Sequence, residues 1–87
     1  MPEFFIGTDI LSVLRISKIL NSHHKNRFKT HTFTKSEIDY CEEKANPSIH
    51  YAGRFSAKEA IKKALLSSGI ISDIPWCSIE ILPEKQG

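Results

Sequence analysis

Two acidic residues and a row of basic residues are the side chains whose types and spacing could do chemistry. Asp9 follows a run of aromatic and β-branched residues, and Glu59 lies beside a basic row of Arg54, Lys58 and Lys62. Like charges spaced four residues apart lie on one side of a helix and repel one another unless an anion bridges them. Basic side chains bind phosphate oxygens, and a neighbouring carboxylate can bind a magnesium ion that the same phosphates hold. The pattern therefore fits a site for a diphosphate with Mg²⁺, and it also fits a solvated basic face.

The choice between these two interpretations depends on Glu59. At roughly 100° per residue, Glu59 shares a helix face with Ala52 and Phe55, so its carboxylate points toward an apolar or interfacial side. An unpaired carboxylate there is costly, and the usual remedies are a bonded cation, a metal ion or protonation. Lys63, four residues later, offers a simple ion pair worth about 0.2–0.5 kcal/mol. Because Mg²⁺ takes one or two protein carboxylates, Asp9 is a natural second ligand, although spacing alone does not pair it with Glu59.

Length and composition restrict the class of protein. The chain has 87 residues, of which 40% are hydrophobic and 25% charged, and this predicts a single domain over residues 1–87. No apolar run approaches the roughly 18 residues of a membrane span, and the N-terminus lacks the pattern of a signal peptide. Cys41 and Cys77 have the spacing of neither a zinc site nor a disulfide framework, and the histidines lack zinc spacing. We therefore expect a cytoplasmic protein.

The charge is distributed unevenly along the chain. The net charge is +2, but residues 1–35 hold six lysines and arginines against two acids, and residues 36–87 hold six against eight. A basic front segment favours an acidic partner, either nucleic acid or an acidic protein, or it is an ordinary solvated surface. A small basic module that binds nucleic acid therefore stays open as an alternative function.

The periodicity of the sequence predicts the elements that would position these residues. A strand over residues 3–10 would deliver Asp9 at its end, and a helix would follow from Ser12 to about residue 21. Residues 23–32 have no apolar period and are expected to form a loop or an irregular helix. Residues 79–82 alternate partly and predict another strand.

Two further helices have clear start signals. Thr34 and Glu37 form a capping box that begins a helix over residues 35–44. Pro47 suits the first position of a longer helix, since its missing N–H costs nothing there. This longer helix carries the basic row, and the serine-serine-glycine sequence at residues 67–69 supplies its stop.

Taken in order, several segments resemble a known family. They are Ile6-Gly7-Thr8-Asp9-Ile10, Arg27-Phe28, Phe33-Thr34-Lys35-Ser36-Glu37, Ala52-Gly53-Arg54-Phe55-Ser56-Ala57-Lys58-Glu59-Ala60 and residues 74–82. In this order they resemble the holo-acyl-carrier-protein synthase family, the small trimeric class of 4′-phosphopantetheinyl transferase. The block around Lys58 and the start around Asp9 are a specific combination, and the resemblance covers almost the whole chain.

The resemblance implies an α+β fold of the 4′-phosphopantetheinyl transferase type, with a long helix packed on a small antiparallel sheet. Three protomers would place active sites at their interfaces. It implies transfer of the 4′-phosphopantetheine group from coenzyme A to a serine of apo acyl carrier protein, with release of adenosine 3′,5′-bisphosphate. Family members continue for about a third again as long, so we expect a fold that is incomplete at its C-terminus. An inactive fragment of the transferase is the remaining alternative.

The resemblance also implies roles for individual residues. Asp9 and Glu59 would bind Mg²⁺ and, together with Lys63, would form the catalytic set. Arg54, Lys58 and Lys63 would bind the phosphates of coenzyme A. Three residues match family positions near the acidic carrier protein: Arg15, Arg27 and Phe28.

Overall fold

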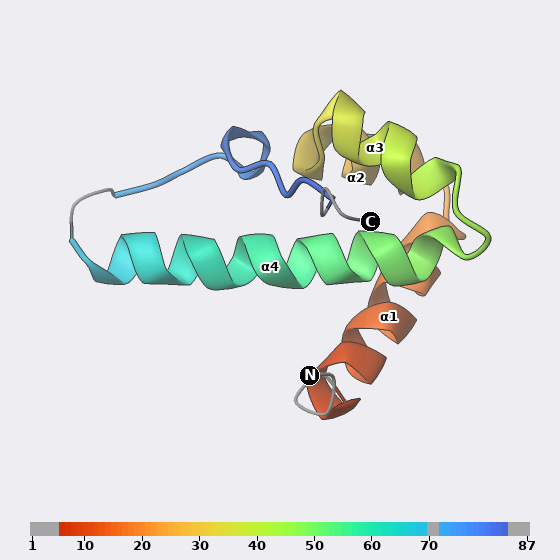
Figure 1. Ribbon diagram of the computed structural model, residues 1–87, viewed down its shortest axis with the longest axis horizontal. Helices are drawn as coiled ribbons and strands as arrows, with labels where there is room; N and C mark the ends of the chain where they lie inside the picture. The colour runs from red at the N-terminus through yellow and green to blue at the C-terminus, as the bar shows by residue number, and fades with distance from the viewer. Residues whose placement is uncertain (1–5, 70–71, 84–87) are drawn as a thin grey trace.

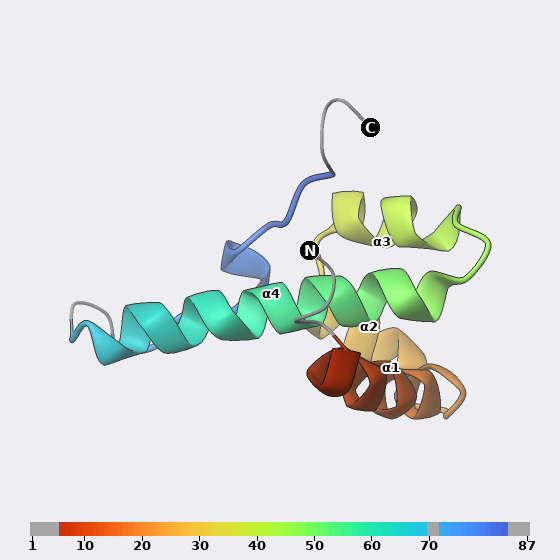
Figure 2. The same cartoon turned by 60° about the horizontal axis from the view of Figure 1, so that its bottom comes forward.

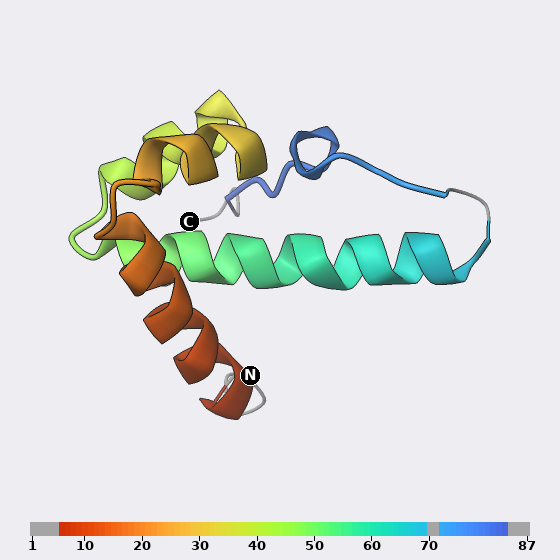
Figure 3. The ribbon, with the colours of Figure 1, turned by 180° about the vertical axis from the view of Figure 1, so that it is seen from behind.

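The structure is a computed structural model that describes residues 6–69 and 72–83. In this part the chain forms α1 (Ile6–Leu20), α2 (Lys25–Thr32), α3 (Lys35–Glu42), α4 (Pro47–Ser67) and the short 3₁₀-helix η2 (Trp76–Ser78). The long helix α4 is central, with α1 on one side and α2, α3 and the η2 segment on the other (Figure 1). Seen from behind, α2 lies in front of α3 (Figure 3). None of the helices described is long and apolar enough to cross a membrane.

The predicted α+β fold with a small antiparallel sheet is wrong for the described residues, because none of them forms a strand. The strand expected over residues 3–10 is helical from Ile6 onward, and residues 3–5 lie outside the described part. Residues 79–82 pair with no strand there, and the N–H of Ile81 instead donates to Oε2 of Glu37 at 2.7 Å. A strand satisfies its backbone only with a neighbour, whereas a helix bonds internally. Without a partner strand, the backbone groups from Ile6 onward are hydrogen-bonded within a helix, and the backbone of Ile81 is hydrogen-bonded to a side chain.

An apolar stripe on α1 packs against the rest of the core. Ile16 is 1% exposed, and Val13 and Leu20 pack beside it at helical spacing. The helix expected from Ser12 is therefore confirmed, although it begins already at Ile6.

Helix α2 is more regular than the sequence predicts. Its residues are mostly polar, yet they form a continuous helix in which Thr32 is buried and Phe28 packs against the core. The ammonium of Lys29 lies 2.6 Å from Oε2 of Glu42 on α3. Tertiary contacts of this kind stabilise short helices that have little tendency to form alone.

The capping box at the start of α3 is confirmed. The Thr34 hydroxyl accepts from the Glu37 N–H at 3.2 Å, and the Thr34 N–H donates to Oε1 of Glu37 at 2.8 Å. Two backbone donors at the helix start are thereby satisfied by side chains. The box fixes the Glu37 carboxylate at the beginning of α3.

Helix α4 begins and ends where the sequence predicts. Pro47 occupies its first turn. At its end, Gly69 has a φ of +80°, the left-handed conformation that glycine adopts without steric cost. An uninterrupted helix between these two signals carries Glu59 and the basic row on one rigid element.

The core is small and rich in aromatic rings. Phe33 and Tyr51 have ring centroids 5.0 Å apart, and Phe55 stacks on Trp76 at the same distance. The hydroxyl of Tyr51 donates to Oε2 of Glu42 at 2.6 Å, which joins α4 to α3. The fully packed cluster consists of Ile16, Phe33, Cys41, Tyr51 and Ala52.

The two thiols should react at very different rates. Cys41 is buried, and this burial raises its pKa to about 11, whereas Cys77 is exposed. Because the thiolate is the nucleophile, we expect iodoacetamide to alkylate Cys77 in the folded protein and Cys41 only after unfolding. The raised pKa also means that stability is lost as pH rises from 9.0 through about 11, since the unfolded thiol ionises first.

Intact-protein mass spectrometry of the wild type and of Cys77→Ser, with and without guanidinium chloride, measures these rates. Alkylation of Cys41 in the folded protein as fast as that of Cys77 would contradict the packing of the core.

Candidate functional site

A groove of about 850 Å³ lies between α1 and α4 and contains one of the predicted site carboxylates. Its α1 wall combines apolar, basic and small polar side chains, and α4 contributes the carboxylate. The lining consists of Leu11, Ser12, Leu14, Arg15, Ser17, Lys18, Asn21 and Glu59. A groove with these groups can hold a ligand that has both a charged and an apolar part.

Small side chains let α1 and α4 approach closely beside this groove. Ser12 is 6% exposed, and the Ser56 hydroxyl donates to the Ser12 hydroxyl at 3.4 Å. Glu59 comes three residues after Ser56, about one helical turn further along α4. The two helices are therefore in contact about one turn before Glu59.

Glu59 does not use the simplest partner that the sequence offers. Lys63 is four residues away and exposed, yet no ion pair joins the two side chains. Among the side chains described, those of residues 11–69 and 72–83, the ion pairs are Lys29–Glu42, Lys35–Asp39 and Lys58–Glu37. A half-buried carboxylate without a protein cation keeps its capacity to bind an external one.

Asp9 lies in α1 by its backbone, but its side chain is outside the described part of the structure. Positions 9, 12 and 16 share one face of an α-helix. Ser12 contacts α4 and Ile16 is buried in the core, so this is the face of α1 that packs inward. The convergence of Asp9 and Glu59 on one metal ion stays a prediction.

The basic row faces the other side of α4. The Arg54 guanidinium lies 4.1 Å from the Tyr40 ring centroid, and the Lys62 ammonium lies 4.2 Å from that of Trp76. These rings belong to α3 and η2, and the partners of Lys58 lie on the same side. Aromatic faces and buried oxygens therefore relieve the repulsion that a bare row of cations would have.

Lys58 is completely buried within this arrangement. Its Nζ lies 2.9 Å from the carbonyl oxygen of Thr32, 3.0 Å from that of Trp76 and 2.7 Å from that of Ile79. Oε1 of Glu37 is also 2.7 Å away. An ammonium has three protons, so these four oxygens leave none free for a phosphate. The expectation that Lys58 binds coenzyme A stays a prediction.

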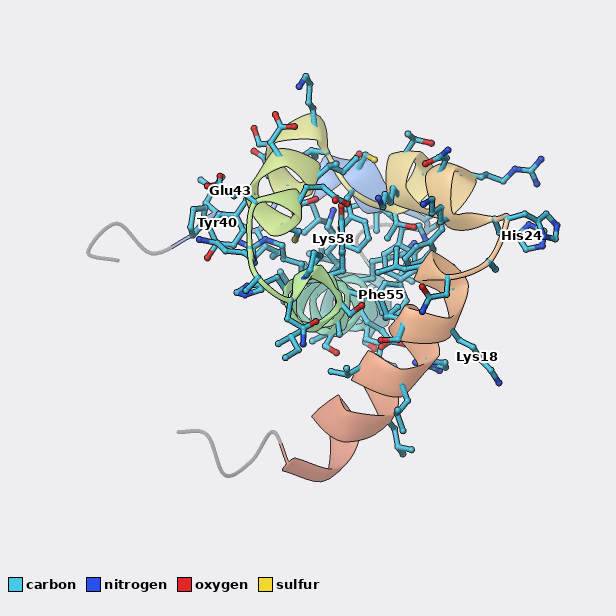
Figure 4. All side chains as sticks on the ribbon, turned by 90° about the vertical axis from the view of Figure 1, so that its right-hand side faces the viewer. Lys18, His24, Tyr40, Glu43, Phe55 and Lys58 are labelled. Carbon is cyan, nitrogen blue, oxygen red and sulfur yellow. The ribbon has the colours of Figure 1, made fainter. Side chains whose placement is uncertain are left out.

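Figure 4 looks along α4 and shows this arrangement. Lys58 points from α4 into the space between α2 and α3, whereas Lys18 and His24 point outward from the molecule. Figure 2 gives the same separation of sides, with α3 above α4 and α1 below it. The groove and the buried lysine therefore belong to different faces of one helix.

Of the three residues expected near a carrier protein, two are exposed and one packs against the core. Arg15 and Arg27 are exposed on α1 and α2, and neither forms an ion pair in the part of the chain described. Phe28 turns inward, with its ring centroid 5.6 Å from that of Phe33 and 6.1 Å from that of Phe55. The two arginines are thus available to a partner, while Phe28 supports the element that carries Arg27.

Sequence reasoning missed a second role of Glu37 and most of the groove wall. The capping box explains only part of what the Glu37 carboxylate does, and no local pattern marks its distant partner Lys58. The groove wall had a usable signal, because positions 11, 14, 15 and 18 share a helical face. Arg15 and Lys18 share this polar side of the helix, and the structure shows that both line the groove.

The donor atoms in the groove suit Mg²⁺. The described residues contain no group of three or more histidine, cysteine, aspartate or glutamate side chains that could hold a metal ion. Mg²⁺ does not require one, since it takes one or two carboxylates and fills its other positions with water and substrate phosphates. The Glu59 carboxylate, two serine hydroxyls and an asparagine amide line the groove with oxygen atoms, the type of ligand that Mg²⁺ prefers.

A second cluster of cations surrounds Tyr40. The Lys44 ammonium lies 4.3 Å from its ring centroid, and the His50 ring meets it edge-on at 5.8 Å. Arg54 is 9% exposed, and its Nε has no hydrogen-bond partner there. Burial lowers the pKa of His50 below 6.5, and the charges of Lys44 and Arg54 lower it further. His50 is therefore held neutral among cations.

Removing one of these charges should raise the pKa of His50. We expect Lys44→Gln to move the titration of the His50 ring, followed by NMR, toward 6.5, because one repelling charge is lost. Lys35→Gln is the matched control, because Lys35 pairs with Asp39 and does not contribute to this shift. A His50 pKa that is unchanged or lower in Lys44→Gln would contradict the cluster.

Comparison with known proteins gives a consistent assignment. The profile of the 4′-phosphopantetheinyl transferase superfamily matches residues 5–87. Holo-acyl-carrier-protein synthase of Chlamydia pneumoniae is 43% identical over 87 residues, covering 100% of this chain and 70% of that protein. Its counterpart in Chlamydia caviae is 46% identical over 86 residues, covering 99% and 69%, and that of Chlorobaculum parvum is 43% identical over 82 residues, covering 94% and 68%.

No solved structure matches this chain. The chain spans about two thirds of the length of the curated relatives it matches. The family resemblance drawn from the sequence motifs is confirmed by the profile and by these relatives. The chain belongs to the 4′-phosphopantetheinyl transferase superfamily.

Proposed function

We propose that this protein transfers the 4′-phosphopantetheine group from coenzyme A to a serine of apo acyl carrier protein, with Mg²⁺ as cofactor. The observation that carries the proposal is the half-buried Glu59, which lines the groove between α1 and α4 and forms no ion pair with the side chains that the structure describes. Arg15 and Lys18 line the same groove and supply positive charge for phosphates. Family membership favours this activity over a nucleic-acid-binding module.

The reaction replaces one phosphorus–oxygen bond by another. The serine oxygen of the carrier would bond to the β-phosphorus of coenzyme A, while the bond from that phosphorus to the oxygen shared with adenosine 3′,5′-bisphosphate breaks and its electron pair leaves with that product. The serine proton would pass to water or to a carboxylate of the site. Asp9 and Glu59 would hold Mg²⁺, which supplies charge stabilisation at the phosphoryl oxygens. Lys63, one turn beyond Glu59, would stabilise the charge that develops on the leaving phosphate.

Two assigned coenzyme contacts are less direct. Arg54 and Lys58 turn toward α3 and η2 and not toward the groove, so this geometry gives no support to the coenzyme A contacts that the family resemblance implies for them. Assembly as a homotrimer and a cytoplasmic location also belong to the proposal on that basis.

Charge complementarity supports the acidic carrier as the partner. Arg15 and Arg27 are exposed on neighbouring helices, and Lys18 and Lys25 are exposed near them. An acidic protein would be attracted to such a surface, and its register would be set by the positions of these charges. Phe28 would contribute by fixing α2 to the core.

Removing either carboxylate should abolish transfer without unfolding the protein. We expect Glu59→Gln and Asp9→Asn each to lower kcat/KM about a hundredfold or more, because a ligand to Mg²⁺ is lost. The readout is the mass increase of apo carrier protein by one phosphopantetheine group, with coenzyme A and Mg²⁺ present.

Glu43→Gln is the matched control, because Glu43 is an exposed carboxylate outside the groove. Far-UV circular dichroism verifies that each variant keeps its helices. Wild-type rates in Glu59→Gln at limiting Mg²⁺ would refute its role as a ligand, and a wild-type protein that adds no group would refute the activity.

Reversing the exposed arginines should weaken binding of the carrier selectively. We expect the double variant Arg15→Glu with Arg27→Glu to raise the KM for apo carrier protein about tenfold or more, since attraction becomes repulsion. In the wild type, this KM should rise with salt, because exposed charges are screened. Lys35→Glu, which changes an exposed lysine on α3, is the control, and an equal rise there would argue against a specific docking surface.

A further inference from the structure

We propose that Lys58 and Glu37 form a buried positioning pair, which fixes the turn of α4 that carries Glu59, and that Lys58 acts through this placement and not as a phosphate ligand. The inference rests on the proposed function for the role of Glu59. It concerns two residues outside the groove, Lys58 on another face of α4 and Glu37 on α3.

The surroundings of Lys58 are complete without a ligand. Its side chain is 0% exposed, and its ammonium is held by three backbone carbonyl oxygens and one carboxylate oxygen. Buried charges are tolerated only when they are paired and hydrogen-bonded, and both conditions are met here. A phosphate could reach Lys58 only after the surrounding segments separate.

The carboxylate of Glu37 likewise has a hydrogen-bond donor for each of its oxygens. Its side chain is 1% exposed, Oε1 accepts from the Thr34 N–H at 2.8 Å, and Oε2 accepts from the Ile81 N–H at 2.7 Å. The Lys58 ammonium is its counterion at 2.7 Å. No oxygen of this carboxylate is left without a donor.

The pair therefore ties together segments that are far apart in the sequence. Lys58 comes from α4, Glu37 from α3, and the carbonyl of Thr32 from the end of α2. Trp76 and Ile79 add the η2 segment. These segments are joined by side-chain hydrogen bonds and not by the backbone hydrogen bonds of a sheet. The Lys58 ammonium and the Glu37 carboxylate provide these bonds.

The connection to the groove follows from helix geometry. Lys58 and Glu59 are consecutive residues, so their side chains leave α4 roughly 100° apart. If Lys58 is held on the inner face, α4 cannot rotate about its axis without breaking several hydrogen bonds. The direction in which Glu59 points into the groove is thereby fixed, and catalysis requires placement of this kind to within a fraction of an ångström.

Four variants test the positioning role. Lys58→Met removes the ammonium, and Glu37→Gln removes the charge while keeping a side chain that can complete the capping box. Lys58→Met combined with Glu37→Leu replaces the pair by apolar groups, which buried sites often tolerate better than a lone charge. Lys62→Met is the matched control, because it removes a cation from the same row one turn further along α4.

Kinetics separate positioning from phosphate binding. Positioning predicts that Lys58→Met and Glu37→Gln both lower kcat about tenfold or more, with the KM for coenzyme A changed by no more than about twofold. It also predicts that the double variant is no worse than the worse single variant, because both residues act as one unit. A Lys58→Met variant with a raised KM for coenzyme A and unchanged kcat, beside a Glu37→Gln variant with wild-type kinetics, would overturn the proposal.

Hydrogen exchange gives a readout that does not depend on activity. We expect the amide of Ile81 to exchange at least tenfold faster in Lys58→Met than in the wild type, and to be unchanged in Lys62→Met. Unchanged protection of Ile81 in Lys58→Met would overturn the positioning pair. If the wild-type protein shows this protection but transfers no phosphopantetheine, the proposed function fails while the positioning pair stands.

Discussion

The interaction on which the rest of the structure depends is the burial of one lysine ammonium among backbone carbonyls. Four oxygens from three separate segments converge on Lys58, and its counterion Glu37 in turn holds the backbone of Thr34 and Ile81. Neither charge could be buried alone, because removing an unpaired ion from water costs more than packing returns. When they pair, each offsets the cost of burying the other, and the pair lies at a junction where α2, α3, α4 and the η2 segment meet. A chain with so small an apolar core needs such a junction.

Helix α4 presents different groups of side chains on two of its faces. Toward α3 and η2 it presents the basic row, whose members are engaged by Tyr40, Trp76 and the buried carboxylate of Glu37. Toward α1 it presents small residues and then Glu59, beside a groove whose other wall carries basic side chains. Because α4 is a single rigid helix, the contacts on its face toward α3 also fix the directions of the side chains on its face toward the groove. The contacts that we propose to hold Glu59 in place lie outside the groove.

Local signals in the sequence predict much of this fold, and long-range contacts account for what they miss. The capping box at Thr34, Pro47 at the start of α4 and Gly69 after its end act within one turn, and all three predictions are confirmed. The strand at residues 79–82 fails, because its backbone finds Glu37 and Lys58 as partners and not another strand. The same long-range pairing hides the structural role of Lys58, which by its spacing alone resembles a phosphate-binding residue. The motif places Glu59 correctly on α4, while its distance from Asp9 depends on how α1 packs.

The central claim is that Asp9 and Glu59 hold one divalent ion against the diphosphate of coenzyme A. Crystals grown with coenzyme A and Mn²⁺ in place of Mg²⁺ test this directly, since anomalous scattering locates the metal. The account predicts one Mn²⁺ in the groove between α1 and α4, at about 2.1 Å from a carboxylate oxygen of each residue and bound to phosphate oxygens of the coenzyme. A metal bound elsewhere, or a coenzyme diphosphate seated away from Glu59, would contradict it.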